Sequence, residues 1–221
     1  MALRERPGGS ATPEIVPIFP LPGVLLLPRT LLPLHIFEPR YRNMTRDAIA
    51  GEQTIAMVQP SGAPGDDADN PPVFPIGCLG RIAKAERADD GRYMLMLVGV
   101  SRFRIVRELP LHEGYRRVIA DYEAYRGDLY EDRTGGIDRA GLLAALRTYL
   151  NVKGLTADWD SVEDARDEAL VNALAMMCPF TPSEKQALLE CADVAERTHA
   201  MITLFRMSGF VANDDAPVVR H

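Results

Sequence analysis

The residues best suited to chemistry are Glu38, Arg40 and Tyr41, in the sequence Glu38-Pro39-Arg40-Tyr41 that closes a long apolar run. A carboxylate beside a guanidinium could serve acid–base catalysis. A structural role fits better, because Pro39 suits the first turn of a helix. Glu38 and Arg40 can then cap that helix or pair with each other. We therefore predict that this corner is structural and that the chain has no catalytic residue.

Metal and redox chemistry have little support in the sequence. The four histidines are scattered and form no H-x-x-x-H pair, and the three cysteines form no C-x-x-C pair. His35 lies in an apolar strand, where a backbone carbonyl or Glu38 is a better partner for its ring than a metal. We predict no metal and no cofactor, and three cysteines buried as small apolar side chains.

Nucleotide hydrolysis and serine chemistry lack their usual motifs. None of the lysines (Lys84, Lys153 and Lys185) follows a glycine, so the phosphate-binding motif G-x-x-x-x-G-K-[ST] does not occur. No serine stands in a G-x-S-x-G sequence. The chain is therefore predicted to be non-enzymatic.

The positive signal is for binding. Val24, Leu25, Leu26 and Leu27 follow a turn at Pro22-Gly23, and four consecutive apolar residues of extended chain cannot all face inward. They are either an exposed interaction patch or are covered by the helical half or a second subunit, and both alternatives stay open. Phe180 is a second candidate for partner binding, with a hinge contact to the β domain as the alternative.

Composition excludes other classes. With 47% hydrophobic and 25% charged residues the chain is typical of globular proteins. No apolar run reaches the ~18 residues of a spanning helix and no signal sequence is visible, so we expect a cytoplasmic protein without membrane contact. Residues 1–128 carry no net charge and residues 129–221 carry −6. Without a basic patch, nucleic acid is not an expected partner.

Prolines and apolar periodicity predict the elements that position these residues. The run Pro17–Tyr41 is too rich in proline for a helix and too apolar for disorder, so it must be extended chain in a core. Residues 13–128 should form a small, partly closed barrel. Its expected strands are 14–18, 31–36, 54–58, 77–86, 92–98, 102–108 and 115–125, with a helix over 39–50.

After Asp128 the apolar period becomes helical. We expect one helix ending at Gly154, a second beginning near Ser161, a third with a capping box at Thr181-Pro182-Ser183-Glu184, and a fourth that Gly209 ends. Residues 129–211 should therefore form a helical bundle subdomain.

The proline-rich run also resembles a known family. It stands as Pro17-Ile18-Phe19-Pro20-Leu21-Pro22-Gly23, then Leu26 and Pro28, then Leu32-Pro33-Leu34-His35-Ile36-Phe37-Glu38-Pro39-Arg40-Tyr41. This pattern resembles the N-terminal, substrate-binding domain of Lon proteases. The likeness continues in Gly77-Cys78-Leu79-Gly80 and in the block Gly99–Ile105, and covers residues 13–210. It implies an α+β fold: a PUA-like, partly closed β-barrel followed by a helical bundle.

The resemblance also implies a function. It points to a polypeptide-recognition module in stand-alone form, without the ATPase and protease modules, that binds unfolded or degron-bearing polypeptide. Adding a strand to an open sheet edge, with apolar pockets, would be the means. An adaptor role with an ATP-dependent protease in protein quality control is a further implication. PUA-like barrels of other families bind RNA, so an RNA-binding accessory protein is the alternative, and a small-molecule pocket is a third.

Overall fold

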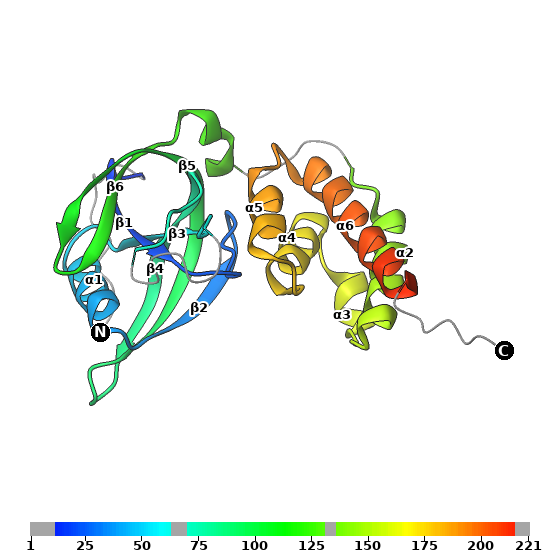
Figure 1. Cartoon of the computed structure of the whole chain (residues 1–221), viewed down its shortest axis with the longest axis horizontal. Coiled ribbons are helices and arrows are strands. Elements are labelled where there is room, and N and C mark those ends of the chain that lie inside the picture. Colours follow the sequence, from blue (N-terminus) through cyan, green and yellow to red (C-terminus); the bar gives the residue numbers. More distant parts are fainter. Residues whose placement is uncertain (1–11, 63–69, 131–135, 215–221) are drawn as a thin grey trace. The chain divides into compact units, whose positions relative to one another are not determined.

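The computed structural model of the chain describes residues 12–62, 70–130 and 136–214 (Figure 1). It divides into two compact units. Unit 1 comprises Met1–Leu21 and Leu26–Leu129, and unit 2 comprises Pro22–Leu25 and Tyr130–His221. The predicted boundary after residue 128 lies beside this division. The sequence did not indicate, however, that Pro22–Leu25 packs with the helical unit.

Unit 1 is a six-stranded mixed sheet with one α-helix. Its strands are β1 (Ile15–Pro20), β2 (Leu31–Ile36), β3 (Thr54–Val58), β4 (Ile76–Arg87), β5 (Tyr93–His112) and β6 (Tyr115–Asp121). Strands β1, β3, β4, β5 and β6 pair in a ring, because β6 bonds to both β5 and β1. Helix α1 (Pro39–Ala50) packs on β1, β3 and β6 (Figure 1). The predicted α+β fold with a partly closed barrel is confirmed.

The barrel is closed over only part of its height. One edge of β5 pairs with β6 along its second half, but with β2 along its first half. Its first half pairs with β2, from Tyr93↔Ile36 to Val98↔Leu31. Its second half pairs with β6, from Arg104 to His112. We expected two strands at 92–98 and 102–108, and the structure joins them into one 20-residue strand. As a result β2 lies at the end of the strand order, with its second edge outside the sheet.

Two glycines of the family-like motifs allow close packing inside the barrel. A Cβ on Gly77 would lie 2.7 Å from the Met57 carbonyl oxygen and 2.8 Å from the Phe103 ring. A Cβ on Gly99 would lie 1.9 Å from the carbonyl oxygen of Leu27. Any side chain at either position would clash with backbone, so these glycines let neighbouring segments approach the sheet.

A buried ion pair attaches the end of unit 1 to the barrel. Strand β6 is shorter than predicted, and the 3₁₀ turns η1 (Glu123–Leu129) follow it. Asp128 of η1 accepts hydrogen bonds from the backbone N–H of Arg102 and from its Nε, both at 2.9 Å, and from its Nη2 at 2.7 Å. Regular alternation along β5 would place Arg102 and Arg104 on the same solvated face. Arg104 is exposed, as that pattern predicts, but Arg102 is buried.

Unit 2 is helical. It contains α2 (Arg139–Lys153), α3 (Trp159–Asp164), α4 (Asp167–Met177), α5 (Pro182–Glu190) and α6 (Val194–Asp214). The predicted helix near Ser161 is two helices, and α6 continues past Gly209. The predicted capping box is present, since Thr181 and Glu184 bond reciprocally. None of the helices in the described ranges is long and apolar enough to cross a membrane.

A buried lysine fastens the Pro22–Leu25 segment within unit 2. The Nζ of Lys185 on α5 donates to the carbonyl oxygen of Gly23 at 2.7 Å and to that of Met176 at 2.8 Å. Met176 lies in the last turn of α4, so the ammonium also stabilises the negative end of that helix. Burial lowers the pKa of Lys185. The two carbonyl contacts offset part of the cost of burying its charge.

Candidate functional site

The leucine run does not form an exposed patch. Leu25, Leu26 and Leu27 are buried, and Val24 is half-buried. A Cβ on Gly80 would lie 2.9 Å from Leu26 Cδ2, which shows how closely Leu26 packs on the barrel. The side chains of Leu25, Leu26 and Leu27 are therefore not accessible to a partner in this structure. A binding role for them stays a prediction that would require them to become uncovered.

Phe180 is also covered. Its ring packs against those of Phe205, at a centroid distance of 5.6 Å, and Tyr149, at 6.1 Å. All three are buried and form the aromatic core of unit 2. Phe180 thus packs inside its own unit, and its role as a partner-binding residue is likewise a prediction without exposure to support it.

The Glu38-Pro39-Arg40-Tyr41 corner is built as a structural element. Arg40 Nε and Nη2 lie 3.1 and 3.0 Å from Glu38 Oε2, and the Arg40 guanidinium lies 4.8 Å from the Tyr41 ring centroid. Tyr41 is buried against Phe19, with ring centroids 4.2 Å apart. Glu38 precedes α1, but its side chain makes no capping bond. Of the two expected arrangements, mutual pairing is the one present.

An apolar surface instead lies on the outer face of β2 and β5. Leu32, Leu34 and Ile36 of β2 point into the core, so their neighbours along the strand point outward. The cross-strand pairs Leu31↔Val98 and Pro33↔Met96 are on this outer face, with Met94 opposite His35. We call the six apolar residues of this face the outer stripe. They are Leu31, Pro33, Phe37, Met94, Met96 and Val98.

The outer stripe is accessible. Leu31 is 60% exposed, Phe37 57% and Met94 52%. Pro33 is also exposed, and Met96 and Val98 are half-buried. The ring of His35 lies 5.9 Å from that of Phe37, so this histidine is on the exposed surface as well. Contiguous exposed apolar side chains of this kind mark interaction sites on globular proteins.

Charged residues of β4 border the outer stripe. Lys84 pairs with Met96 and Glu86 with Met94 across the β4–β5 ladder, and Lys84 Nζ lies 2.7 Å from Glu86 Oε1. An apolar centre with a polar border is the usual arrangement of a binding surface. The two methionines add adaptability, because an unbranched thioether side chain can pack against many shapes. This surface can therefore hold apolar side chains of varied shape.

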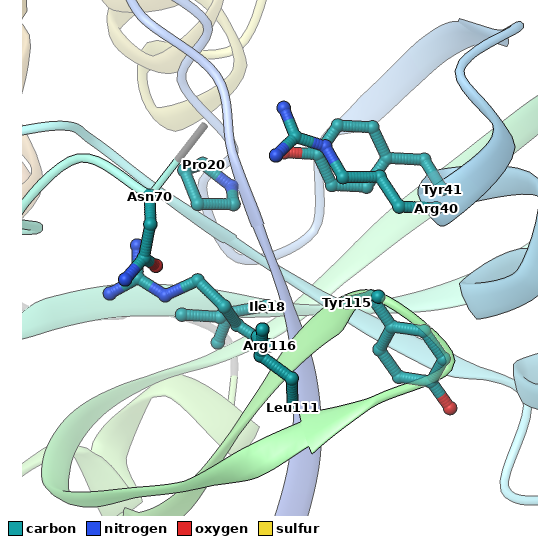
Figure 2. Close-up of a pocket in the computed structure, with 9 residues that line it drawn as sticks. Ile18, Pro20, Arg40, Tyr41, Asn70, Leu111, Tyr115 and Arg116 are labelled. Carbon is teal, nitrogen blue, oxygen red and sulfur yellow. The ribbon is translucent and has the colours of Figure 1, made fainter. Parts of the chain in front are cut away.

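A second feature of unit 1 is a cavity between β1, α1 and the β5–β6 hairpin (Figure 2). Its volume is about 190 Å³. The residues that line it are Ile18, Pro20, Arg40, Tyr41, Asn70, Leu111, Gly114, Tyr115 and Arg116. The Tyr115 hydroxyl points away from the cavity and donates to Asp47 Oδ2 at 3.0 Å. Burial, together with this hydrogen bond, raises the pKa of Tyr115 to about 12.

The described residues offer little for metal chemistry or thiol reactivity. Within them, no three histidine, cysteine or acidic side chains come together as a metal site. All three cysteines are buried, as predicted, and burial raises the pKa of the Cys178 thiol to about 11.

Sequence reasoning missed the outer stripe although a signal was present. Strand β5 begins Tyr93-Met94-Leu95-Met96-Leu97-Val98, which is apolar on both faces, and β2 is apolar at nearly every position. A barrel strand with one solvated face should alternate with polar residues. Two adjacent strands without that alternation indicate that the outer face is covered or binds a partner.

Comparison with known proteins places this architecture in a family. The model for the ATP-dependent protease La (LON) substrate-binding domain matches residues 15–206. Lon protease 2 of Sorangium cellulosum is 28% identical over 200 residues, which cover 86% of this chain and 24% of that protein. The Lon protease of Desulfosudis oleivorans is 36% identical over 93 residues, or 42% of this chain and 11% of that one. The chain thus spans about a quarter or less of the length of these relatives.

Solved structures support the same fold. The Lon N-terminal domain protein from Xanthomonas campestris superposes with a TM-score of 0.59 at 20% identity, covering 86% of this chain and 97% of that one. The N-terminal domain of the Mycobacterium avium complex Lon protease gives a TM-score of 0.58 at 17% identity, with coverages of 87% and 98%. At this identity the similarity concerns the fold alone.

Proposed function

This chain belongs to the LON substrate-binding domain family, and we propose that its outer stripe binds apolar segments of unfolded polypeptide. The observation that supports the proposal is the exposure of Leu31, Phe37 and Met94 on one sheet face. Unfolded chains differ from folded ones mainly in exposing apolar side chains. An apolar surface with adaptable methionines therefore binds unfolded chains in preference to folded ones, without requiring one particular sequence.

The size of the surface implies weak, transient binding. Burying an apolar side chain is worth roughly 1.5–3 kcal/mol, and the outer stripe can contact two or three such side chains. Ordering a flexible peptide costs several kcal/mol of this gain. We expect dissociation constants on the order of 10 μM or weaker. Such affinities suit a module that samples polypeptides and releases them.

Side-chain contacts fit this surface better than addition of a complete strand. Strand β2 has an edge outside the sheet, which is the requirement for strand addition. Pro33 stands in the middle of β2 and has no backbone N–H. A proline in an edge strand is normally placed with its missing donor toward the free edge, which interrupts a ladder there. The main energy of binding would then come from the apolar side chains.

The proposal also covers what happens to polypeptide after it is bound. The curated relatives are Lon proteases, and we infer that this chain delivers polypeptide to an ATP-dependent protease as an adaptor. The described residues beside the outer stripe do not favour the RNA-binding alternative. The charges beside the outer stripe are an opposite pair, Lys84 and Glu86, and phosphate recognition needs a cluster of one sign.

The test compares a stripe variant with a matched control. Leu31→Thr together with Met94→Thr makes the outer stripe more polar while keeping strand propensity. Val106→Thr makes the same kind of change at an exposed apolar residue later in β5. Fluorescence anisotropy with a labelled, permanently unfolded protein should show at least fivefold weaker binding for the stripe variant and an unchanged affinity for the control. Neither the stripe variant nor the control variant should bind a folded reference protein. Equal affinities of wild type and stripe variant for the unfolded protein would refute the proposal.

A further inference from the structure

The cavity between β1, α1 and the β5–β6 hairpin combines apolar walls with two cations. Ile18, Pro20 and Leu111 and the ring of Tyr115 supply apolar surface. Among the described residues that line it, Arg40 and Arg116 carry a charge and none carries a carboxylate. Figure 2 shows the two arginines on different sides of Pro20, Arg40 coming from α1 beside Tyr41 and Arg116 from β6 beside Asn70. The lining therefore favours a ligand that is partly apolar and negatively charged.

The volume limits the size of that ligand. Pockets for drug-sized molecules and cofactors measure roughly 300–1,000 Å³. At about 190 Å³ this cavity is smaller. It suits a single amino-acid residue rather than a nucleotide or another large cofactor.

Both arginines can exchange a carboxylate partner. Arg40 is paired with Glu38, and Arg116 with Glu108, whose Oε2 lies 3.1 Å from Arg116 Nε. The side chains of Glu38 and Glu108 are each 42% exposed, while the arginines are more deeply placed. Ion pairs with a solvated member are worth little, so an incoming carboxylate can replace or join them.

Arg116 is also held in position independently of its carboxylate partner. Its Nη1 donates to the Pro71 carbonyl oxygen at 2.6 Å, and its side chain is nearly buried. A guanidinium has five N–H hydrogens, and Nε, Nη1 and Nη2 each use one on an acceptor within the described residues. Two further N–H groups remain for a ligand. A pre-positioned guanidinium of this kind recognises carboxylates with bidentate geometry.

We propose that this cavity binds the C-terminal residue of a polypeptide, with its apolar side chain inside and its α-carboxylate on Arg40 and Arg116. In a polypeptide, only the C-terminal residue carries an apolar side chain and a carboxylate on the same Cα. The proposal deepens the proposed function, because it supposes that polypeptides are the ligands. It adds a second site, which binds the end of a chain, whereas the outer stripe binds apolar segments within a chain.

The test uses peptides that engage the cavity without the outer stripe. A labelled ten-residue peptide of serine, glycine and threonine ends in a single leucine, either as the free acid or as the amide. A third peptide ends in serine as the free acid. We expect wild-type protein to bind the leucine acid at least tenfold more tightly than the leucine amide or the serine acid. All three peptides lack the apolar segments that the outer stripe would hold.

Two variants assign the effect to the cavity. Arg40→Gln should reduce the ratio between acid and amide to below threefold. Arg104→Gln removes the same charge from an exposed residue outside the cavity and should keep the ratio. A wild-type ratio near one overturns this inference, as does an unchanged ratio in Arg40→Gln. Failure of every peptide to bind, while the unfolded protein binds through the outer stripe, overturns the inference and leaves the proposed function standing. If the leucine acid binds but the unfolded protein does not, the proposed function of the outer stripe is overturned and the inference about the cavity stands.

Discussion

Replacing Asp128 by alanine should destabilise the barrel strongly, because the change leaves the buried charge of Arg102 without its carboxylate partner. The side chains of Arg102 and Asp128 are 6% and 9% exposed. The carboxylate accepts three hydrogen bonds from Arg102, at 2.7 to 2.9 Å, and the guanidinium lies 4.7 Å from the Tyr125 ring centroid. Removing one partner of such a pair typically costs about 3–5 kcal/mol. Because solvent cannot reach the guanidinium freely, water replaces little of that loss.

The double variant Arg102→Met with Asp128→Leu tests the cause. Exchanging a buried ion pair for apolar residues of similar volume is often neutral, so more than half of the lost stability should return. The exposed neighbour Arg104 supplies the control, since Arg104→Ala should change the free energy of unfolding by less than about 0.5 kcal/mol.

The assay can separate the two units. The chain has a single tryptophan, Trp159, which lies in unit 2, so its fluorescence reports unfolding of that unit. The barrel contributes all of the described β-structure, and its unfolding in urea can be followed by hydrogen exchange of the strand amides, read by mass spectrometry. We expect Asp128→Ala to lower the urea concentration at which the barrel unfolds. The urea midpoint of the tryptophan signal should stay within error of wild type. A loss below 1 kcal/mol in the barrel would contradict the burial argument.

Three further predictions concern particular side chains. Lys185→Met should destabilise unit 2 by about 2–4 kcal/mol, seen in the Trp159 transition, because two partly buried carbonyl oxygens lose a charged donor. The raised pKa of Tyr115, about 12, means that between pH 10 and 12 the unfolded chain releases a proton that the folded protein keeps. Stability should therefore fall across this window, and Tyr115→Phe should flatten the fall; an equally steep fall in the variant would contradict the assignment. Cys178, with its pKa raised to about 11, should resist alkylation at pH 8 until urea unfolds unit 2, as mass spectrometry would show.

The sequence determined most of the elements because their signals are local. Pro39 at the start of α1, the Thr181–Glu184 capping box and Gly154 in the left-handed conformation after α2 act within one turn of chain. Each was correctly predicted from neighbouring residues alone. The fold class followed from the family-like motifs, of which Gly77 and Gly99 are required by close backbone approach.

The features that the sequence did not reveal depend on distant packing. Ser101, Arg102 and Phe103 are three consecutive buried residues, because a shift in register beside Val100 interrupts the alternation of β5. A rule of alternating faces therefore assigned Arg102 to solvent. The burial of the leucine run depends on segments such as Gly80, far along the chain. The exposure of the outer stripe likewise depends on which segments pack against β2 and β5 and was not evident from those strands alone.

The central claim is that the outer stripe contacts unfolded polypeptide, and the methionine methyl groups test it most directly. Met94 and Met96 lie in the outer stripe, while Met177 and Met207 are exposed on unit 2. In protein labelled with ¹³C at the methionine methyls, adding a permanently unfolded protein should shift the NMR signals of Met94 and Met96 in a saturable way. The signals of Met177 and Met207 should stay in place. Shifts confined to Met177 and Met207, or none at Met94 and Met96 under saturating conditions, would contradict the account.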